Sequence, residues 1–235
     1  MLTCWLSAPE SAAGLTVLGP ASTTPGLKAL ATQFSAKTGI AVTVGGGGRA
    51  QVFDILNKGG AADVVVLPTT DLIESPRITG MSPLGHVSVG VGVKAGSKVP
   101  DVSTPEKFVA ALSASRGVAY ADPQAGTSAG KIIDQMLSTP DFAKVKRVPV
   151  QGLAVTALQS GQADIALQML PELAGNKDVA LAGAVPESYG ASVDFSAGIA
   201  VQTVNAVEAQ AFISFLTDPH NATLWNENGL RLLGH

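Results

Sequence analysis

Residues 40–67, IAVTVGGGGRAQVFDILNKGGAADVVVL, decide the fold that we predict for this chain. A β-branched apolar run leads into four glycines at 45–48, and a segment with apolar residues at helical spacing follows. A second apolar run comes after Gly59-Gly60. β-Branched runs favour strands, and glycine pairs mark the turns between elements. The stretch therefore predicts a strand, a helix and a second strand, with a loop of bare backbone before the helix.

The glycine loop at 45–48 predicts a site for an anion. Glycine has no Cβ, so its backbone N–H groups can turn toward a ligand, and at a helix N-terminus they meet the positive end of the helix dipole. Arg49 follows and could add a planar fork of donors. The alternative is a tight turn with Arg49 in water. No Gly-Lys-Ser/Thr follows the glycines, and the G-x-G-x-x-G pattern with its later acidic residue is absent, so nucleotide binding is not expected.

Composition narrows the class of protein. At 235 residues the chain exceeds a usual domain of roughly 100–150 residues, which predicts two lobes. It is 46% hydrophobic and 14% charged with a net charge of −3, which favours a packed globular protein and argues against nucleic acid as a partner. No apolar run reaches the roughly 18 residues of a membrane span, so no membrane insertion is expected.

No metal or other cofactor is predicted. The three histidines, His86, His220 and His235, stand far apart without a second ligand at helical spacing. Cys4 is the single cysteine, so it forms no internal disulfide. Asp63 opens an apolar run after a glycine pair, where we expect it to fix a turn rather than bind a metal.

The pattern of strand, small-residue loop and helix recurs along the chain. GLTVLG at 14–19 predicts a first strand, and the loop beyond it contains Ser22. Residues 117–120 predict another strand, followed by the loop ADPQAGTSAG at 121–130. In open α/β sheets the carboxyl ends of the strands line the ligand crevice, so Ser22 and the glycine loop should face one space. The helices after these two loops are predicted from two apolar stripes: Leu27, Leu30, Ala31 and Phe34, and Ile132, Ile133, Met136 and Leu137.

Two extended segments are predicted to connect the lobes. Residues 86–93 should leave the first lobe, and residues 192–201 should return, so that the pair forms a hinge. The expected division is lobe I at 14–85 with 198–235, lobe II at 86–197, and an N-terminal tail at 1–13. The fold class is α/β, with a mixed sheet flanked by helices in each lobe.

Five motifs together carry a family resemblance. They are VLGPAST after the first strand, the glycine loop, GGAADVVVL, YADPQAGTSAGK and the C-terminal FLTDPHNATLWNENGL. In this order they resemble the molybdate-binding protein family, the solute receptors of ABC importers, from about residue 14 to the C-terminus. The resemblance implies a type II periplasmic binding fold whose two lobes close on an oxyanion, a monomer, and an ABC permease as partner.

The resemblance also implies which residues bind the ligand. Ser22 matches the first-loop serine, whereas the second-loop serine falls on Gly48, so that hydroxyl is absent. Met169 stands where some members have a tyrosine. With Arg49 in the pocket, an organic carboxylate becomes a candidate ligand beside an oxyanion. The implied ligand contacts are Ser22, Gly47, Gly48, Arg49, Ser128, Ala129, Gln151 and Met169.

Two functions remain open at this stage. We expect a binding protein rather than an enzyme, and the alternative is an isomerase of a small polycarboxylate, because some proteins that resemble this group, aconitate isomerase among them, move a proton. Candidate bases are His86, Tyr120 and Asp122, but none has a partner at a suggestive spacing. Strand-end packing also explains Tyr120, and capping before Pro123 explains Asp122. The absence of a G-x-S-x-G motif argues against a hydrolase, and the absence of a helix-turn-helix argues against a DNA-bound regulator.

The N-terminal sequence MLTCWLSAPESAAG leaves the compartment open. It has no basic n-region and only a short apolar run, so it does not predict a secretory signal. We expect a periplasmic protein if a leader is missing from this sequence, and a cytoplasmic one otherwise.

Overall fold

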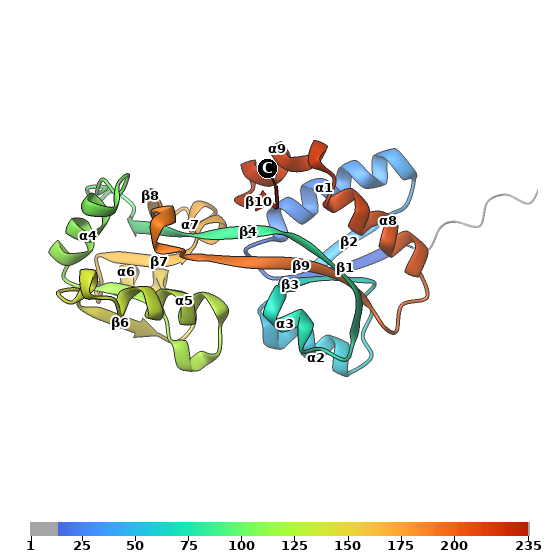
Figure 1. Ribbon diagram of the computed structural model, residues 1–235, viewed down its shortest axis with the longest axis horizontal. Coiled ribbons are helices and arrows are strands. Elements are labelled where there is room, and N and C mark those ends of the chain that lie inside the picture. The colour runs from blue at the N-terminus through green and yellow to red at the C-terminus, as the bar shows by residue number, and fades with distance from the viewer. Residues whose placement is uncertain (1–13, 235) are drawn as a thin grey trace, which may run out of the picture.

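The computed structural model describes residues 14–234 as two α/β lobes connected by two long strands (Figure 1). The predicted tail at 1–13, with Cys4, and His235 lie outside the described residues. The strands form a mixed sheet in the order β2-β1-β3-β9-β4-β7-β5-β6, and β8 and β10 each pair with β4. Their bounds are β1 Leu15–Gly19, β2 Val42–Gly46, β3 Val64–Pro68, β4 Ile78–Lys94, β5 Val118–Ala121, β6 Arg147–Val150, β7 Ile165–Met169, β8 Val179–Ala184, β9 Ser192–Ala200 and β10 Leu230–Leu232.

Helices cover the sheet in both lobes (Figure 1). The α-helices are α1 Thr24–Thr38, α2 Arg49–Asn57, α3 Thr69–Ile73, α4 Pro105–Ala114, α5 Ser128–Leu137, α6 Val155–Ser160, α7 Leu170–Ala174, α8 Ala206–Leu216 and α9 Ala222–Glu227. Single 3-10 turns lie at η1 Pro123–Ala125, η2 Pro140–Phe142, η3 Glu187–Tyr189 and η4 Pro219–Asn221. Among residues 14–234, none of these helices combines the length and the apolar character needed to cross a membrane.

The first lobe is organised by parallel strands. β1 pairs in parallel with β2 and β3, and the four residues at 64–67 of β3 are fully buried, as expected for a strand covered on both faces. The apolar residues predicted for the first helix are buried in α1. The ring of Phe34 packs edge to face on the ring of Phe212 in α8, with the two ring centroids 5.1 Å apart. The prediction that residues 40–67 form a strand, a helix and a strand is therefore confirmed.

The second lobe repeats this arrangement. β5 pairs in parallel with β6 and β7, and β7 pairs antiparallel with β4. The ring of Phe108 in α4 packs on the ring of Phe142, with the ring centroids 5.6 Å apart, and both rings are buried in the core of this lobe.

β4 and β9 run through both lobes, as expected for the two crossing segments (Figure 1). β4 is 17 residues long; it pairs with β9 from Ile78 to Ser88 and with β7 from Val89 to Val93. β10 pairs with β4 at residues 85–87 and so returns the C-terminal chain to the first lobe.

The structure corrects the expected extent of two loops. Gly45 and Gly46 belong to β2, paired with Leu18 and Gly19, so the glycine loop is reduced to Gly47 and Gly48. The second loop also ends early, because the capping hydroxyl of Thr127 starts α5 at Ser128. Three further elements, α7, β8 and β10, are not predicted from the sequence.

Candidate ligand-binding site

Two adjoining hollows of about 710 and 160 Å³ lie between the lobes, and we call them together the cleft. They share Arg49, Asp71, Ser128 and Val193. The first lobe contributes the loops after β1 and β2 and the start of α3, and the second lobe contributes α5 and the β7–α7 junction. Most of these segments follow the carboxyl ends of strands, where open α/β sheets bind ligands.

Two helices open on the cleft from opposite lobes. α2 starts at Arg49 with Gly48 as its N-cap, and α5 starts at Ser128 with Thr127 as its N-cap. Thr127 Oγ1 accepts a hydrogen bond from Gly130 N at 3.1 Å. Within residues 14–234 the backbone N–H groups of Arg49 and Ser128 donate to no other residue. Such first-turn donors at the positive end of a helix suit an anion.

Arg49 is held in place within the cleft. Its Nε donates to Asp71 Oδ1 at 2.8 Å, and its guanidinium lies 4.9 Å from the centre of the Phe53 ring. The arginine side chain is 48% exposed, against 13% for Asp71. Its two terminal nitrogens make no hydrogen bond with another described residue, so they are available to a ligand. The alternative given for the glycine loop, a tight turn with Arg49 in water, does not include this pairing with Asp71.

Glu172 brings a carboxyl group to the smaller hollow. Gln168 Nε2 donates to its Oε2 at 2.7 Å. Burial raises the pKa of Glu172, and the hydrogen bond from Gln168 opposes part of that shift. The Oε1 atom of Gln168 is buried and has no partner among the described residues.

Six of the eight implied ligand positions lie together: Ser22, Gly48, Arg49, Ser128, Ala129 and Met169 all line the cleft. Gly47 and Gln151 do not line either hollow. Gln151 instead donates to Asp122 Oδ2 at 2.7 Å, which directs its side chain toward the start of the η1 loop.

The three candidate bases lie outside the cleft lining. Asp122 accepts a hydrogen bond from Gln124 N at 2.9 Å, which is the capping role that its position before Pro123 suggested. Tyr120 is buried and its hydroxyl donates to Asp134 Oδ1 at 2.6 Å, and burial raises its pKa to about 12. His86 lies in β4 opposite Arg231 of β10. None of them is placed to take a proton from a ligand in the cleft.

Asp63 has a wider structural role than the turn expected for it. Its buried carboxylate accepts hydrogen bonds from Thr16 N at 2.7 Å, from Asn205 Nδ2 at 3.1 Å and from the Thr203 hydroxyl. It therefore ties β1 to the segment that leaves β9. In the described part of the chain no three His, Cys, Asp or Glu side chains are grouped to hold a metal.

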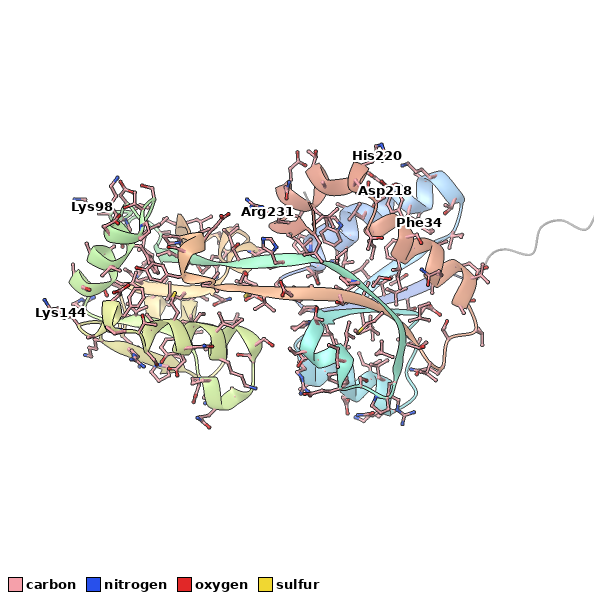
Figure 2. The ribbon with its side chains drawn as sticks, in the orientation of Figure 1. Phe34, Lys98, Lys144, Asp218, His220 and Arg231 are labelled. Atoms are coloured by element: carbon pink, nitrogen blue, oxygen red, sulfur yellow. The ribbon has the colours of Figure 1, made fainter. Side chains whose placement is uncertain are left out.

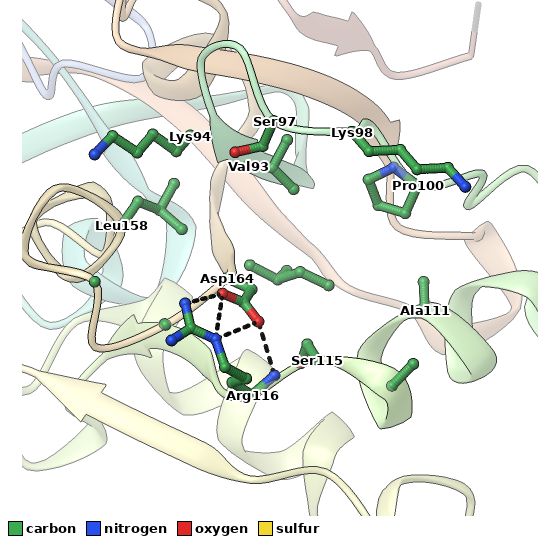
Figure 3. A pocket seen from close by; sticks show the side chains of 14 residues that line it. Val93, Lys94, Ser97, Lys98, Pro100, Ala111, Ser115, Arg116, Leu158 and Asp164 are labelled. Carbon is green, nitrogen blue, oxygen red and sulfur yellow. Dashed lines mark hydrogen bonds and ion pairs between the residues drawn. The ribbon is translucent and has the colours of Figure 1, made fainter.

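A further cavity of about 560 Å³ lies at the outer end of the second lobe (Figure 3). Its arginine, Arg116, is already paired: Nη2 and Nε reach Asp164 Oδ1 at 2.6 and 3.1 Å. Figure 3 shows this pair across the floor of the cavity, with Lys94 and Lys98 directed away from it. The cleft is the better candidate, because the N-termini of α2 and α5 open on it and six of the eight implied ligand positions line it.

Asp71 and Glu172 line the cleft but are not among the residues predicted from the sequence. Both lie on five-residue helices, α3 and α7, that begin where a buried strand ends. The available signal was an acidic residue within one turn of the carboxyl end of a strand, as in MLPE at 169–172.

Comparison with known proteins identifies the family. The sequence pattern of the family described as bacterial extracellular solute-binding protein matches residues 15–231. The chain belongs to this family. The resemblance drawn from the sequence motifs is thereby confirmed at the level of the solute-binding proteins and their type II periplasmic binding fold.

Solved structures of solute-binding proteins share this fold. The periplasmic molybdate-binding protein of Azotobacter vinelandii has a TM-score of 0.65 at 21% identity, with 92% of this chain and 98% of that chain covered. PEB3, a Campylobacter jejuni protein solved with L-phospholactate bound, has a TM-score of 0.68 at 18% identity, with 92% and 99% covered. Identities this low show a common fold and leave the ligand of this solute-binding protein open.

One curated relative is an enzyme. Aconitate isomerase from Pseudomonas sp is 23% identical over 150 residues, which make up 63% of this chain and 57% of the isomerase. This solute-binding protein thus matches little more than half the length of that relative.

Proposed function

We propose that this protein is a receptor that captures a small anion between its lobes and delivers it to the permease of an ABC importer outside the cytoplasmic membrane. The observation that carries the proposal is the convergence of the α2 and α5 N-termini on one cleft beside Arg49. Free first-turn N–H groups and a fixed guanidinium are the donors that a carboxylate or oxyanion needs. The relatives solved with or named for molybdate and phospholactate support a small anion.

The ligand acts by closing the cleft. The lobes are residues 14–85 with 198–235, and residues 86–197, and β4 and β9 form the hinge between them. A ligand that contacts both Arg49 of one lobe and Ser128 of the other makes all its contacts only when the cleft is closed. The free energy of these additional contacts shifts the equilibrium toward the closed form. A monomer is sufficient for this function, because one chain supplies both walls of the cleft.

Calorimetric titration tests the proposal. The panel is molybdate, tungstate, sulfate, phosphate and a set of di- and tricarboxylates. The Arg49→Ala variant should weaken binding of the tightest anion at least tenfold, since a hydrogen bond to a charged group contributes about 1.5–3 kcal/mol. Arg116→Ala is the matched control, because it also removes a half of an arginine–aspartate pair but lies outside the cleft. Equal affinities of Arg49→Ala and wild type would refute the role of Arg49, and a panel without any binder would refute the receptor.

A second candidate function is proton transfer within a small polycarboxylate. Its support is the match to aconitate isomerase together with Glu172, a cleft carboxyl that could take a proton from a ligand carbon and return it to another as the double bond shifts. Proton NMR in D₂O tests it: solvent deuterium entering cis- or trans-aconitate with wild type and not with Glu172→Gln would favour the isomerase. If the wild-type protein does not change the spectra, the isomerase function is rejected and only the receptor function remains.

A further inference from the structure

The charges around the cleft are not those of a simple anion trap. Only two cationic side chains line it, against four carboxyl groups: Arg49 and Lys131, against Asp71, Glu74, Glu172 and Asp194. A site built only from donors would not place so many acceptors around its ligand. The cleft therefore has acceptors that a second kind of ligand group must satisfy.

Some of these acceptors are already bound within the protein. Asp71 Oδ1 accepts a hydrogen bond from Arg49 Nε, and Glu172 Oε2 accepts one from Gln168 Nε2. Glu172 Oε1 has no hydrogen-bond partner among residues 14–234. In the described chain, Gln168 Oε1 is the one side-chain atom that is both fully buried and without a hydrogen-bond partner. Glu172 Oε1 also lacks a partner, so it is not fully buried.

Glu172 also lies in the right place to contact a ligand. It lines the smaller hollow together with Arg49, Ser22 and Ser128, the groups that would hold an anion. A ligand whose carboxylate is bound at Arg49 and the helix N-termini thus lies in a hollow that the Glu172 side chain also lines. The two sides of this hollow differ in what they can offer: donors from α2 and α5, and an acceptor from α7.

Oxyanions and hydroxy acids would meet Glu172 differently. Molybdate and sulfate carry no proton at neutral pH, so their oxygens only accept hydrogen bonds and are repelled by a carboxylate. A hydroxyl group on a carboxylate ligand can donate to that oxygen. A donor and acceptor pair of this kind discriminates strongly, because the analogue without the hydroxyl leaves the acceptor unpaired.

We propose that the cleft selects small hydroxycarboxylates, with the ligand carboxylate held by Arg49 and the N-termini of α2 and α5, and the ligand hydroxyl donating to Glu172. The inference rests on the proposed anion receptor and names its ligand class. Glu172 is the residue that determines specificity, and it distinguishes acids that differ only by one hydroxyl.

Matched pairs of acids test the proposal by calorimetry. Malate is compared with succinate, and lactate with propionate, on wild type, Glu172→Ala, Glu172→Gln and the exposed control Glu106→Ala. Wild type should bind the hydroxy acid of a pair at least tenfold more tightly. Glu172→Ala should bring the ratio close to one, and Glu172→Gln, which keeps an acceptor oxygen, should retain part of it. Arg49→Ala should weaken both members of a pair by a similar factor, and Glu106→Ala should leave the ratio unchanged.

The possible outcomes distinguish failure of the hydroxycarboxylate proposal from failure of the proposed anion receptor. Equal affinity for malate and succinate, or molybdate binding more tightly than any hydroxy acid, would overturn the hydroxycarboxylate class and leave an anion receptor standing. A wild-type ratio that persists in both Glu172 variants would overturn the role of Glu172. Failure of every anion to bind would overturn the receptor itself. Thermal unfolding of each variant verifies that it is folded, and Glu172→Gln, nearly equal in shape, keeps the test available if Glu172→Ala does not fold.

Discussion

Glu172 is a side chain whose charge opposes folding, because burial raises its pKa above the ordinary value of 4.5. A folded-state pKa above the unfolded one means that the folded protein binds the proton more tightly. Its stability therefore falls as pH rises from the unfolded pKa through the folded one, and the cost is absent at lower pH, where both states are protonated.

We predict that Glu172→Gln unfolds at a higher temperature than wild type at pH 7 to 8, and that the difference disappears toward pH 4. The amide cannot ionise, and it preserves an oxygen for Gln168 Nε2. Midpoints of thermal unfolding at pH 4, 5, 6, 7 and 8 measure the effect in the ligand-free protein. If the difference in unfolding midpoint between the variant and wild type were the same at every pH, ionisation of Glu172 would not be its cause.

Individual residues were predictable from the sequence where their place follows from the ends of strands. Ser22 and Arg49 come directly after β1 and β2, so the crossover rule for parallel strands brings them to one edge. Gln151 also follows a strand end, but its side chain is bonded to Asp122, a contact across 29 residues that no local pattern encodes. The network of Asp63 with Thr203 and Asn205 is of the same non-local kind.

At the level of elements, the four glycines that seemed alike in sequence have different roles. Gly46 has a φ of +117°, and a Cβ there would lie 2.5 Å from the carbonyl oxygen of Gly19 in β1. Gly48 has a φ of −62°, and a Cβ there would meet nothing within 4 Å. Only Gly46 is required by the close approach of β2 to β1.

Serine substitutions at the two positions should separate these roles. Gly46→Ser should destabilise the protein by about 2 kcal/mol or more, because strain and a backbone clash combine there. Gly48→Ser should be neutral or slightly stabilising, since serine is a preferred N-cap and would cap α2. Chemical denaturation measures both. Equal losses at the two sites would show that the loop conformation differs from the one described.

The elements missed from sequence share a physical reason. α7 has five residues, too few to show an amphipathic stripe, and β8, VALAGA, is a half-exposed strand of small residues that pairs only with β4. β10 has three residues and exists because it pairs with β4. By contrast α1 and β3, whose patterns are long or strongly apolar, were predictable because local preference and burial agree there.

Across the whole molecule, one ion pair connects the lobes outside the lining of the cleft. Arg231 Nη1 of β10 lies 3.0 Å from Glu187 Oε1 of η3. Figure 2 shows Arg231 above β4, whereas α3 and α5, which border the cleft, lie below it in the same orientation of Figure 1. If the lobes rotate about β4 and β9 so that α3 approaches α5, Arg231 and Glu187 on the opposite side of β4 move apart. The pair therefore stabilises, against that rotation, the arrangement of the lobes that the structure shows.

We predict that Glu187→Ala tightens binding of the preferred anion about two- to fivefold, although Glu187 lies outside the cleft. The size follows from the pair, which is exposed on both sides and so contributes at most about 1 kcal/mol. Arg231→Ala should have a similar effect, and the double variant should add little to either, because each single change already removes the interaction. The gain should shrink at 0.5 M NaCl, where screening weakens the pair in wild type. Unchanged or weaker affinity in both single variants would mean that closure does not separate the two sides of the hinge, and that the lobes meet the ligand by some other motion.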